Sequence, residues 1–376
     1  MKVALLTDCY LPRLGGIEVQ THDLAAQLTA RGHEVEVFTA TPGEQGLRHG
    51  NTEVVDGITV HRMAIRLPWD LPVNPLAPPE VRRRLAAGGF DVAHVHMGVV
   101  SPFATDLAGV SLGAGLPTAI TWHCLMERSK PVFRLLGHAR RWGRRGAALS
   151  AVSSVAAANV QSVVGPGSPV HVLNNGIDAS LWSCPPQRRR RSEGAPVRVV
   201  AAMRFAARKR PVAVLEIAAA ARALVPVGTR MELTLFGEGP ERRRLERYVA
   251  EHGLHDWVSL PGRVSRDELR SRYWESDLYL TPARLEAFGI AALEARTAGL
   301  PVLARRDTGV GDFVVDGHNG VLGADDQALA RGLAALVGNH DLRARMTAAN
   351  AIPPAQTWDA VAAAAEAEYR RAGAVS

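Results

Sequence analysis

Residues 1–39 read MKVALLTDCYLPRLGGIEVQTHDLAAQLTARGHEVEVFT, and this stretch decides the fold class. An apolar run at 1–7 is followed by a loop with Gly15 and Gly16, then by an amphipathic segment that stops at Gly32, then by the alternating run EVEVFT. This order predicts a strand, a loop, a helix and a second strand. The two strands would pair in parallel as a βαβ unit, with which doubly wound sheets begin.

The same alternation of strand and helix signals continues along the chain. Further strands are predicted at 57–62, 92–96, 117–122, 148–152 and 170–173, and then at 197–203, 231–236, 257–260, 277–280 and 301–304. Between the two series, residues 180–196 read SLWSCPPQRRRRSEGAP, whose prolines and arginine run are typical of a linker. The sequence therefore predicts two α/β halves, with an alanine-rich helix at the end of the chain.

Composition and length exclude several classes of protein. The chain has 376 residues, of which 47% are hydrophobic and 22% charged, which excludes a disordered or collagen-like protein. No apolar run reaches the roughly 18 residues of a membrane-spanning helix, and no signal peptide is evident at the start, so we expect a cytoplasmic protein. Cys9, Cys124 and Cys184 are isolated, which supports neither a disulfide framework nor a zinc cluster.

The net charge favours an anionic partner. Lys and Arg number 44 against 37 Asp and Glu, which gives +7 with His neutral. Aromatic residues make up only 5%, and no basic stretch carries the aromatic side chains on which single-stranded nucleic acids stack. We therefore expect no nucleic acid as a partner, which leaves phosphorylated substrates and anionic lipid.

Three short segments carry residues suited to binding a phosphorylated ligand. Gly15 and Gly16 stand where the first strand gives way to a helix, although a simple tight turn would also explain them. Arg204 and Lys209 follow a predicted strand, where two cations suit a diphosphate as well as a solvated basic loop. The strongest signal is the segment 286–294, EAFGIAALE, which begins and ends with a glutamate. A helix that starts near Phe288 is predicted here, and its first amides would be available to an anion.

Taken in order, these segments resemble the retaining glycosyltransferases of family 4, and the resemblance covers nearly the whole chain. It rests on GGIE at 15–18, RGHEV at 31–35, DVAHVH at 91–96, NNGID at 174–178, FGEGP at 236–240 and the Glu-x7-Glu element. The resemblance implies an α/β protein of the GT-B fold, with two Rossmann-like doubly wound domains facing across a cleft. We expect an acceptor-side domain over 1–186, a linker over 187–196, a nucleotide-sugar domain over 197–355 and a helix over 356–376 that could pack back on the first domain.

The resemblance also implies roles for individual residues, in a reaction that needs no metal and no other cofactor. Arg204 and Lys209 would neutralise the leaving diphosphate, Glu294 would hold the ribose hydroxyls, and Gly15 and Gly16 would complete the phosphate cradle. The remaining donor-binding residues would be Val264 near the base and the amides of Phe288, Gly289 and Ile290 at the phosphates. Glu286 would position the transferred sugar, and His123 would contact the sugar and orient the acceptor, with His94 and His96 behind it.

Three positions depart from the family pattern. The usual Lys-Gly is Lys209-Arg210 here, the usual Ser is Ala283, and the familiar Gly-Gly-x-x-Glu loop reads GVGD at 309–312. These departures leave the donor sugar open, although the charged residues of the pattern are present.

Basic segments in the first half bear on the acceptor. Arg82–Arg84 and the stretch 131–145, where apolar and basic residues alternate, suit an amphipathic helix on anionic lipid or an ordinary solvated surface. The first expectation is therefore a retaining hexosyltransferase, peripheral at the inner face of the membrane, that moves mannose from GDP-mannose to a phosphatidylinositol glycolipid. The alternatives are a soluble transferase with a small acceptor, such as an inositol phosphate, a sugar or a natural product, and an inactive nucleotide-sugar-binding module.

Overall fold

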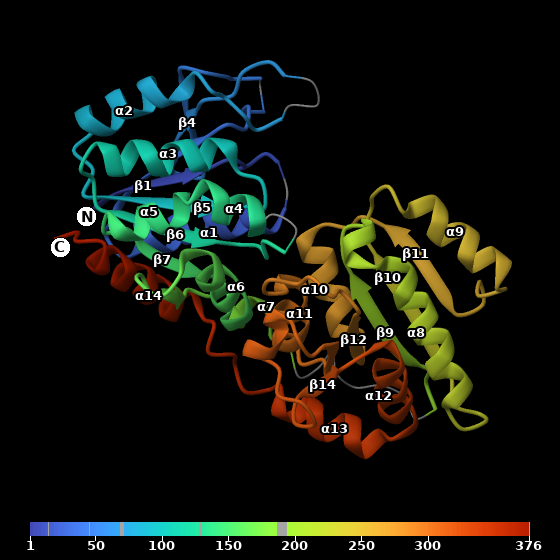
Figure 1. Cartoon of the computed structure of the whole chain (residues 1–376). Helices are drawn as coiled ribbons and strands as arrows, with labels where there is room; N and C mark the ends of the chain where they lie inside the picture. Colours follow the sequence, from blue (N-terminus) through green and yellow to red (C-terminus); the bar gives the residue numbers. More distant parts are fainter. Residues whose placement is uncertain (14, 45, 68–70, 128–129, 186–193, 376) are drawn as a thin grey trace. The chain divides into compact units, whose positions relative to one another are not determined.

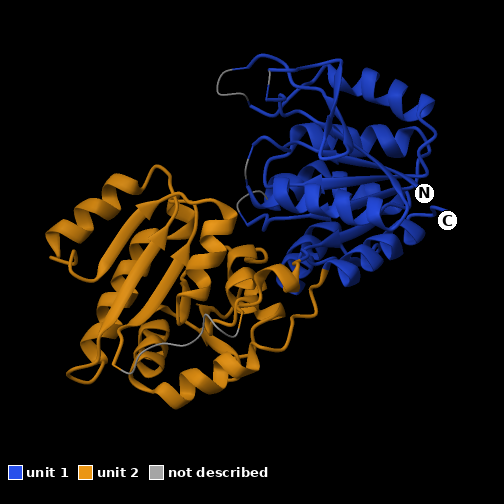
Figure 2. Cartoon of the chain, turned by 180° about the vertical axis from the view of Figure 1, so that it is seen from behind, with its two compact units in different colours: residues 1–176, 358–376 blue, residues 177–357 orange. Residues whose placement is uncertain are grey.

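The computed structural model describes residues 1–13, 15–44, 46–67, 71–127, 130–185 and 194–375. The chain divides into two compact units, the first made of Met1–Gly176 with Trp358–Ser376 and the second of Ile177–Thr357 (Figure 2). Each unit is built around its own parallel sheet (Figure 1). The predicted α/β class with two doubly wound units is therefore confirmed.

The first unit contains a sheet of eight described strands in the order β3-β4-β2-β1-β5-β6-β7-β8, in which every pair but β3–β4 is parallel. Helices α2 and α3 cover one side of this sheet, and α1 and α14 pack together on the other (Figure 1). The strands are β1 (Lys2–Thr7), β2 (Glu34–Thr39), β3 (Asn51–Val55), β4 (Ile58–Arg62), β5 (Val92–Met97), β6 (Thr118–Trp122), β7 (Ala148–Ala151) and β8 (Val170–Val172). The helices are α1 (Gly16–Ala30), α2 (Ala77–Ala87), α3 (Pro102–Gly113), α4 (Lys130–Leu136), α5 (His138–Arg144), α6 (Ser154–Val164) and α14 (Trp358–Arg371).

The second unit contains a sheet of six described strands in the order β11-β10-β9-β12-β13-β14, all parallel. The strands are β9 (Val197–Ala202), β10 (Met231–Phe236), β11 (Val258–Gly262), β12 (Leu278–Thr281), β13 (Val302–Arg305) and β14 (Gly320–Gly323). The helices are α7 (Ala179–Trp182), α8 (Pro211–Leu224), α9 (Arg242–Glu251), α10 (Arg266–Trp274), α11 (Ile290–Thr297), α12 (Asp326–Gly338) and α13 (His340–Ala349), with 3-10 turns η3 (Ala207–Lys209) and η4 (Gly309–Asp312).

The strand order places a switch point in each sheet, where the chain turns from building one edge to building the other. In the first sheet β1 lies between β2 and β5, and in the second β9 lies between β10 and β12. Ligands of doubly wound sheets bind beyond the carboxyl ends of the strands at such a point. The loops that follow β1, β5, β9 and β12 are therefore the places where functional side chains are expected.

The two units differ from the predicted domains at one boundary. The first unit ends at Gly176 and not at residue 186, because α7 packs against α11 and Trp182 accepts a hydrogen bond from the indole of Trp274. The predicted linker at 187–196 falls mostly on residues outside the described ranges. At the other end of the second unit, the chain returns at Trp358, and helix α14 becomes part of the first unit.

Helix α14 contributes to the core of the first unit through one apolar face. Trp358, Val361, Ala365 and Tyr369 are buried together with residues of α1, β1 and β2. Gly176 permits this packing, because a Cβ there would lie 2.3 Å from the indole of Trp358. The last helix is therefore a structural layer of the first unit, since it covers the face of the sheet beside α1.

Candidate active site

Two loops at the switch point of the second sheet carry the predicted donor-binding cations and the predicted catalytic residue Glu286. Arg204 and Lys209 lie in the loop from β9 to α8, and Glu286 lies in the segment from β12 to α11. The Nζ atom of Lys209 lies 2.5 Å from Oε2 of Glu286, with the two side chains 23% and 16% exposed. Arg204 is exposed to solvent. The structure thus places a cation and a carboxylate in contact at the edge where a ligand is expected.

The segment that carries Glu286 is held by Gly309, which the sequence analysis named as part of the GVGD loop without giving it a role. The amide of Gly309, in η4, donates to the carbonyl oxygen of Glu286 at 2.9 Å. A Cβ on Gly309 would lie 2.0 Å from the carbonyl oxygen of Ala287, so only glycine permits this approach. Phe288 is buried beside Phe313, with the ring centroids 5.3 Å apart. These contacts fix the backbone from Glu286 to the start of α11.

Helix α11 begins at a strained turn that also requires glycine. Gly289 precedes the helix with φ 95°, a conformation in which other residues are strained, and a Cβ there would meet Val310 at 2.8 Å. The helix itself starts at Ile290, two residues later than the predicted start near Phe288. The amides of this turn are therefore placed at a helix N-terminus, where anions are stabilised.

Glu294 lies one turn further along α11 and is buried. Its Oε1 atom lies 3.4 Å from Nε of Arg266, which follows the N-cap Ser265 of α10. Val264, half-buried, lies in the loop between β11 and α10. The proposed ribose-binding carboxylate is therefore paired with an arginine from the loop that carries Val264, and the sequence offered no signal for Arg266.

In the first unit, His123 follows β6 and forms part of a group of three histidines. Its Nε2 atom lies 2.9 Å from Nδ1 of His96, which is the last residue but one of β5. The register of the sheet explains this contact, because His96 pairs with Thr7 of β1 and with Thr121 of β6. Burial lowers the pKa of His123 to about 4, so that its ring is neutral at physiological pH.

His94 lies two residues before His96 in β5, on the same face of the sheet, and is fully buried. The two rings are 4.2 Å apart, and His94 contacts the hydroxyl of Tyr369 at 2.9 Å and that of Thr121 at 2.7 Å. Burial lowers the pKa of His94 to about 3 and holds that of His96 well below its usual value. Tyr369 belongs to α14, a partner that nothing in the sequence near His94 indicates.

Gly15 ends the loop that follows β1, and Gly16 is the first residue of α1. Gly15 is the N-cap of α1 in an extended conformation, and a Cβ there would meet the carboxylate of Glu18 at 2.4 Å. The loop is anchored by the buried Arg62, which donates to the carbonyl oxygen of Leu11 at 2.6 Å and to Glu53 at 2.6 Å. Because the carboxylate of Glu18 is the end of a flexible side chain and the φ of Gly15 is extended, the packing alone does not require glycine at this position.

The predicted residues divide between the two units. Lys209, Glu286, Phe288, Gly289 and Ile290 adjoin at the switch point of the second sheet, with Arg204 in the same loop as Lys209 and with Glu294 and Val264 on or beside α11 and α10. Gly15, Gly16 and His123 lie at the carboxyl ends of β1 and β6 in the first unit.

The basic stretch 131–145 is two short helices and not the single amphipathic helix that the sequence suggested. Gly137, with φ 63°, separates α4 from α5. Trp142 of α5 is buried, whereas Val132, Leu135 and Leu136 of α4 are 55%, 87% and 51% exposed. The exposed apolar side chains of this stretch are therefore concentrated on α4.

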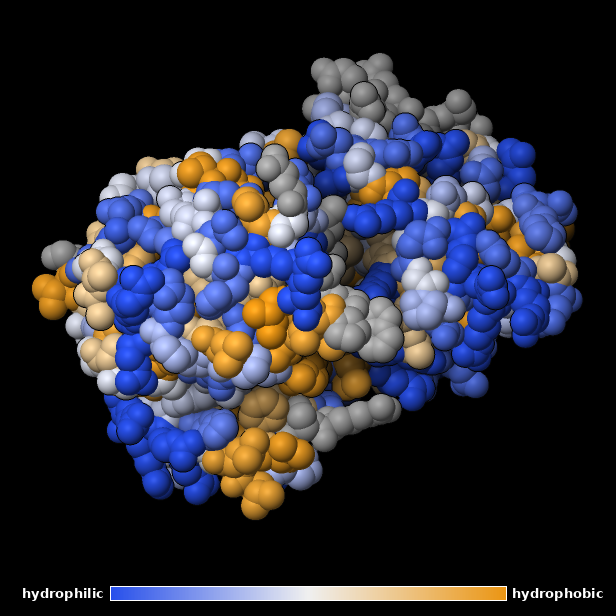
Figure 3. All heavy atoms as spheres, turned by 90° about the horizontal axis from the view of Figure 1, so that it is seen from above, coloured by the Kyte–Doolittle hydropathy of each residue, from blue (hydrophilic) through white to orange (hydrophobic). Residues whose placement is uncertain are grey.

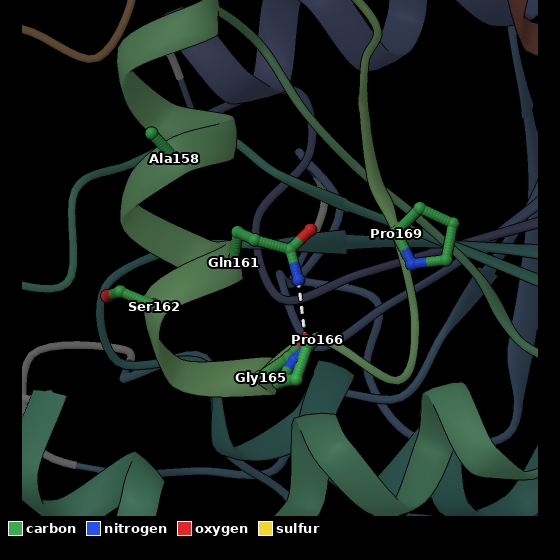
Figure 4. Close-up of a pocket in the computed structure, with 6 residues that line it drawn as sticks. All are labelled: Ala158, Gln161, Ser162, Gly165, Pro166 and Pro169. Carbon is green, nitrogen blue, oxygen red and sulfur yellow. Dashed lines mark hydrogen bonds between the residues drawn. The ribbon is translucent and has the colours of Figure 1, made fainter.

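Other features of the described residues add little to the site. A shallow hollow at the end of α6 is lined by Ala158, Gln161, Ser162, Gly165, Pro166 and Pro169, and none of the predicted site residues lines it (Figure 4). There the side-chain amide of Gln161 donates to the carbonyl oxygen of Gly165 at 2.6 Å.

Within the described ranges, no three acidic, His or Cys side chains gather as metal ligands. None of the described helices has the length and apolar character to cross a bilayer.

Comparison with known proteins identifies the family. The family model described as Glycosyltransferase Family 4 matches residues 14–181, and that described as Glycosyl transferases group 1 matches residues 187–351. Among curated relatives, a D-inositol 3-phosphate glycosyltransferase of Stackebrandtia nassauensis is 31% identical, over 95% of this chain and 88% of the relative. A GDP-mannose-dependent alpha-(1-6)-phosphatidylinositol monomannoside mannosyltransferase of Mycobacterium tuberculosis is 26% identical, over 96% of each chain.

Solved structures agree with this fold. Anabaena HepE, in complex with UDP and glucose, has a TM-score of 0.73 at 21% identity over 98% of each chain. A sucrose-phosphate synthase of Thermosynechococcus elongatus has a TM-score of 0.73 at 19% identity over 100% of each chain. The fold is therefore that of the GT-B glycosyltransferases, as the sequence predicted. The chain belongs to glycosyltransferase family 4.

Proposed function

We propose that the protein transfers a hexose from a nucleotide diphosphate sugar without a metal ion. The observation that carries this proposal is the contact of Lys209 with Glu286 at the switch point of the second sheet. A diphosphate that displaced Glu286 from the ammonium would gain a charge-assisted contact, and developing charge on the leaving group would be stabilised there. The exposed Arg204 in the same loop supplies a second cation without having to break a contact with Glu286.

For the remaining residues we propose the roles that the family resemblance implies. Glu294 accepts hydrogen bonds from the ribose hydroxyls, and the amides at Phe288, Gly289 and Ile290 cap the phosphates at the start of α11. The loop of Val264 contacts the base, Gly15 and Gly16 complete the phosphate cradle, and Glu286, once released from Lys209, positions the hydroxyls of the sugar. His123, half-buried and neutral because desolvation lowers its pKa, contacts the sugar and orients the acceptor.

The donor we propose is GDP-mannose, with retention of the anomeric configuration. The named mannosyltransferase relative uses GDP-mannose, which supports this choice over UDP sugars, although HepE was solved with UDP. Calorimetry with GDP, UDP and ADP, in the absence of metal, tests the proposal on wild type, on Lys209→Ala and on the exposed neighbour Arg208→Ala. We expect GDP to bind most tightly to the wild type. This binding should be lost in Lys209→Ala and kept in Arg208→Ala. No binding of any nucleotide to the wild type would overturn the proposal, and proton NMR of the first product reports the anomeric configuration.

For the acceptor, we propose a lipid-linked molecule at an anionic membrane. Helix α4 supports this choice, because Val132, Leu135 and Leu136 are exposed beside Lys130 and the exposed Arg134. In Figure 3, hydrophobic side chains are gathered in groups among hydrophilic ones on the face that it draws. In co-sedimentation with phosphatidylinositol vesicles at low salt, the wild type should be found in the pellet and Leu135→Ser in the supernatant. Val227→Ser, at an exposed site of the second unit, should sediment as the wild type does. Wild-type protein that stays in the supernatant would exclude this acceptor.

A second candidate acceptor is a soluble inositol phosphate. Its support is the relative of Stackebrandtia nassauensis, whose name specifies D-inositol 3-phosphate and which exceeds 30% identity. Transfer of labelled sugar to inositol 3-phosphate in the absence of vesicles would favour this acceptor. Tight donor binding with no hydrolysis or transfer to either acceptor would instead favour an inactive nucleotide-sugar-binding module.

A further inference from the structure

The loop that carries Lys209 ends in a conformation that is unfavourable for its last residue. Arg210 has φ 57° and ψ 51°, in the left-handed region, between η3 and α8. Among the described residues, Asp56 is the other non-glycine with positive φ, and aspartate tolerates this region because its short side chain bonds locally. Arginine has no such compensation in its own backbone. A contact elsewhere must therefore hold Arg210 in place.

That contact is made by the guanidinium. Nη1 and Nη2 of Arg210 donate to the two carboxylate oxygens of Asp326 at 2.8 and 2.5 Å, a bidentate pair with the first residue of α12. Nη1 also donates to the carbonyl oxygen of Pro282 at 3.1 Å. The pair is 21% and 31% exposed. A two-pronged, partly buried contact of this kind fixes orientation as well as position.

The two anchors lie on elements that matter for the site. Pro282 begins the segment from β12 to α11, in which Glu286 contacts Lys209. Arg210 and Lys209 are neighbours in the chain, and each binds this same segment, one through Pro282 and the other through Glu286. Asp326 then ties both to α12, which packs against α8 and β14 in the core of the unit.

We propose that Arg210 is a positioning residue that presents Lys209 to the donor diphosphate. The inference rests on the proposed function, because it assigns Lys209 to that diphosphate. Without the Arg210 side chain, the backbone at this position is free to leave the left-handed region, and the ammonium of Lys209 moves with it. The loss falls on phosphate binding, since neither Arg210 anchor touches the residues assigned to the ribose or the base.

The test is calorimetry of the nucleoside diphosphate that wild type binds, together with its parent nucleoside. For Arg210→Ala and Asp326→Asn, we expect about tenfold weaker binding of the diphosphate and unchanged binding of the nucleoside. Arg210→Gly, which keeps the left-handed backbone accessible, should lose less than Arg210→Ala. Arg208→Ala, on the same loop and exposed, should bind as wild type.

Two double variants separate positioning from a general loss of stability. Arg210→Ala should add nothing to Lys209→Ala, because it acts through that lysine, and Arg210→Ala with Asp326→Asn should equal either single variant. Thermal unfolding of each variant establishes that the measurements are made on folded protein. Wild-type affinity for the diphosphate in Arg210→Ala, or an equal loss for the nucleoside, would overturn the inference while Lys209→Ala still upholds the proposed function. A wild type that binds no nucleotide would overturn both.

Discussion

The hydroxyl of Tyr369 lies 2.9 Å from Nδ1 of His94, so that the C-terminal helix reaches the histidines behind His123. Both side chains are fully buried. The residues are 275 positions apart in the chain, and the contact therefore couples the integrity of α14 to the geometry of β5.

Tyr369→Phe removes this hydrogen bond and keeps the ring. We expect a loss of about 1 to 2 kcal/mol in unfolding free energy, because His94 is left with an unpaired buried nitrogen. Turnover should fall several-fold through the displaced His96 and His123. The control is Tyr248→Phe on α9, whose ring stacks on His252. Urea unfolding and a transfer assay check the prediction, and equal behaviour of the two variants would refute it.

Acid should destabilise the protein well above the range in which carboxylates titrate. His94 and His123 have folded pKa values of about 3 and 4, against an ordinary value near 6.5, so the unfolded chain takes up protons first as pH falls. Stability is then lost from about pH 6.5 down to about pH 4, by about 2 kcal/mol for His123 alone at pH 5. Melting temperatures at pH 7 and pH 5 measure this loss.

The titration of Asp8 has the opposite effect on stability as the pH falls. Burial raises its pKa to about 6, although Ser101 and the amides of Phe103 and Ala104 donate to it, so that protonation near pH 5 favours the folded state. Asp8→Asn should therefore steepen the loss of stability on acidification. A melting temperature that rises from pH 7 to pH 5 in the wild type would contradict the dominance of the histidines.

Glu286→Gln should separate donor binding from catalysis. The variant removes the negative charge that competes with phosphate for Lys209, so we expect the nucleoside diphosphate to bind several-fold more tightly. Turnover should fall at least tenfold, because the sugar loses the carboxylate that positions its hydroxyls. Calorimetry and initial rates give the two quantities, with the exposed Glu251→Gln as control. Weaker binding together with unchanged turnover would refute both roles.

Gly309→Ala should displace the backbone that carries Glu286. The added Cβ would lie 2.0 Å from the carbonyl oxygen of Ala287, which forces the backbone beside Glu286 to move. We expect a loss of about 1 to 3 kcal/mol in stability and at least tenfold weaker nucleotide binding. Gly311→Ala, in the same 3-10 turn, is the matched control, because its nearest contact would be 3.8 Å. Indistinguishable variants would show that the close approach is unimportant.

Chelation should leave the reaction unchanged. In the proposed reaction, Arg204 and Lys209 would supply the positive charge that a metal would otherwise bring to the leaving diphosphate. After dialysis against EDTA, we expect the same nucleotide affinity and the same rate of transfer. An activity lost on dialysis and restored by Mg²⁺ or Mn²⁺ would refute the prediction.

The sequence was informative wherever local pattern and topology together decide position. Strand signals located β1, β2, β5 and β9, and the position of Arg204 and Lys209 at the carboxyl end of β9 was predicted. The rule that parallel strands present their carboxyl ends at one edge explains why Lys209 meets Glu286, 77 residues away. The register of β5 and β6 likewise brought His96 to His123.

Contacts that depend on side-chain packing between distant segments were not predictable. The pairing of Arg210 with Asp326 spans 116 residues, and neither residue type reveals its partner in a chain with 44 basic and 37 acidic residues. The glycine at 137 that divides α4 from α5 is one of 35 glycines, and the sequence around it reads as a helix. The burial of Trp142 depends on where α5 packs, which no local pattern encodes.

The division of the first unit between the two ends of the chain bears on the order in which the protein folds during synthesis. Domains generally fold as they leave the ribosome, the N-terminal one first. Here the apolar face over β1 and α1 stays uncovered until Trp358, Val361, Ala365 and Tyr369 have been made, after the last residue of the second unit. A chain that ends at Thr357 and has left the ribosome should thus hold a second unit that resists protease and a first unit that is cleaved.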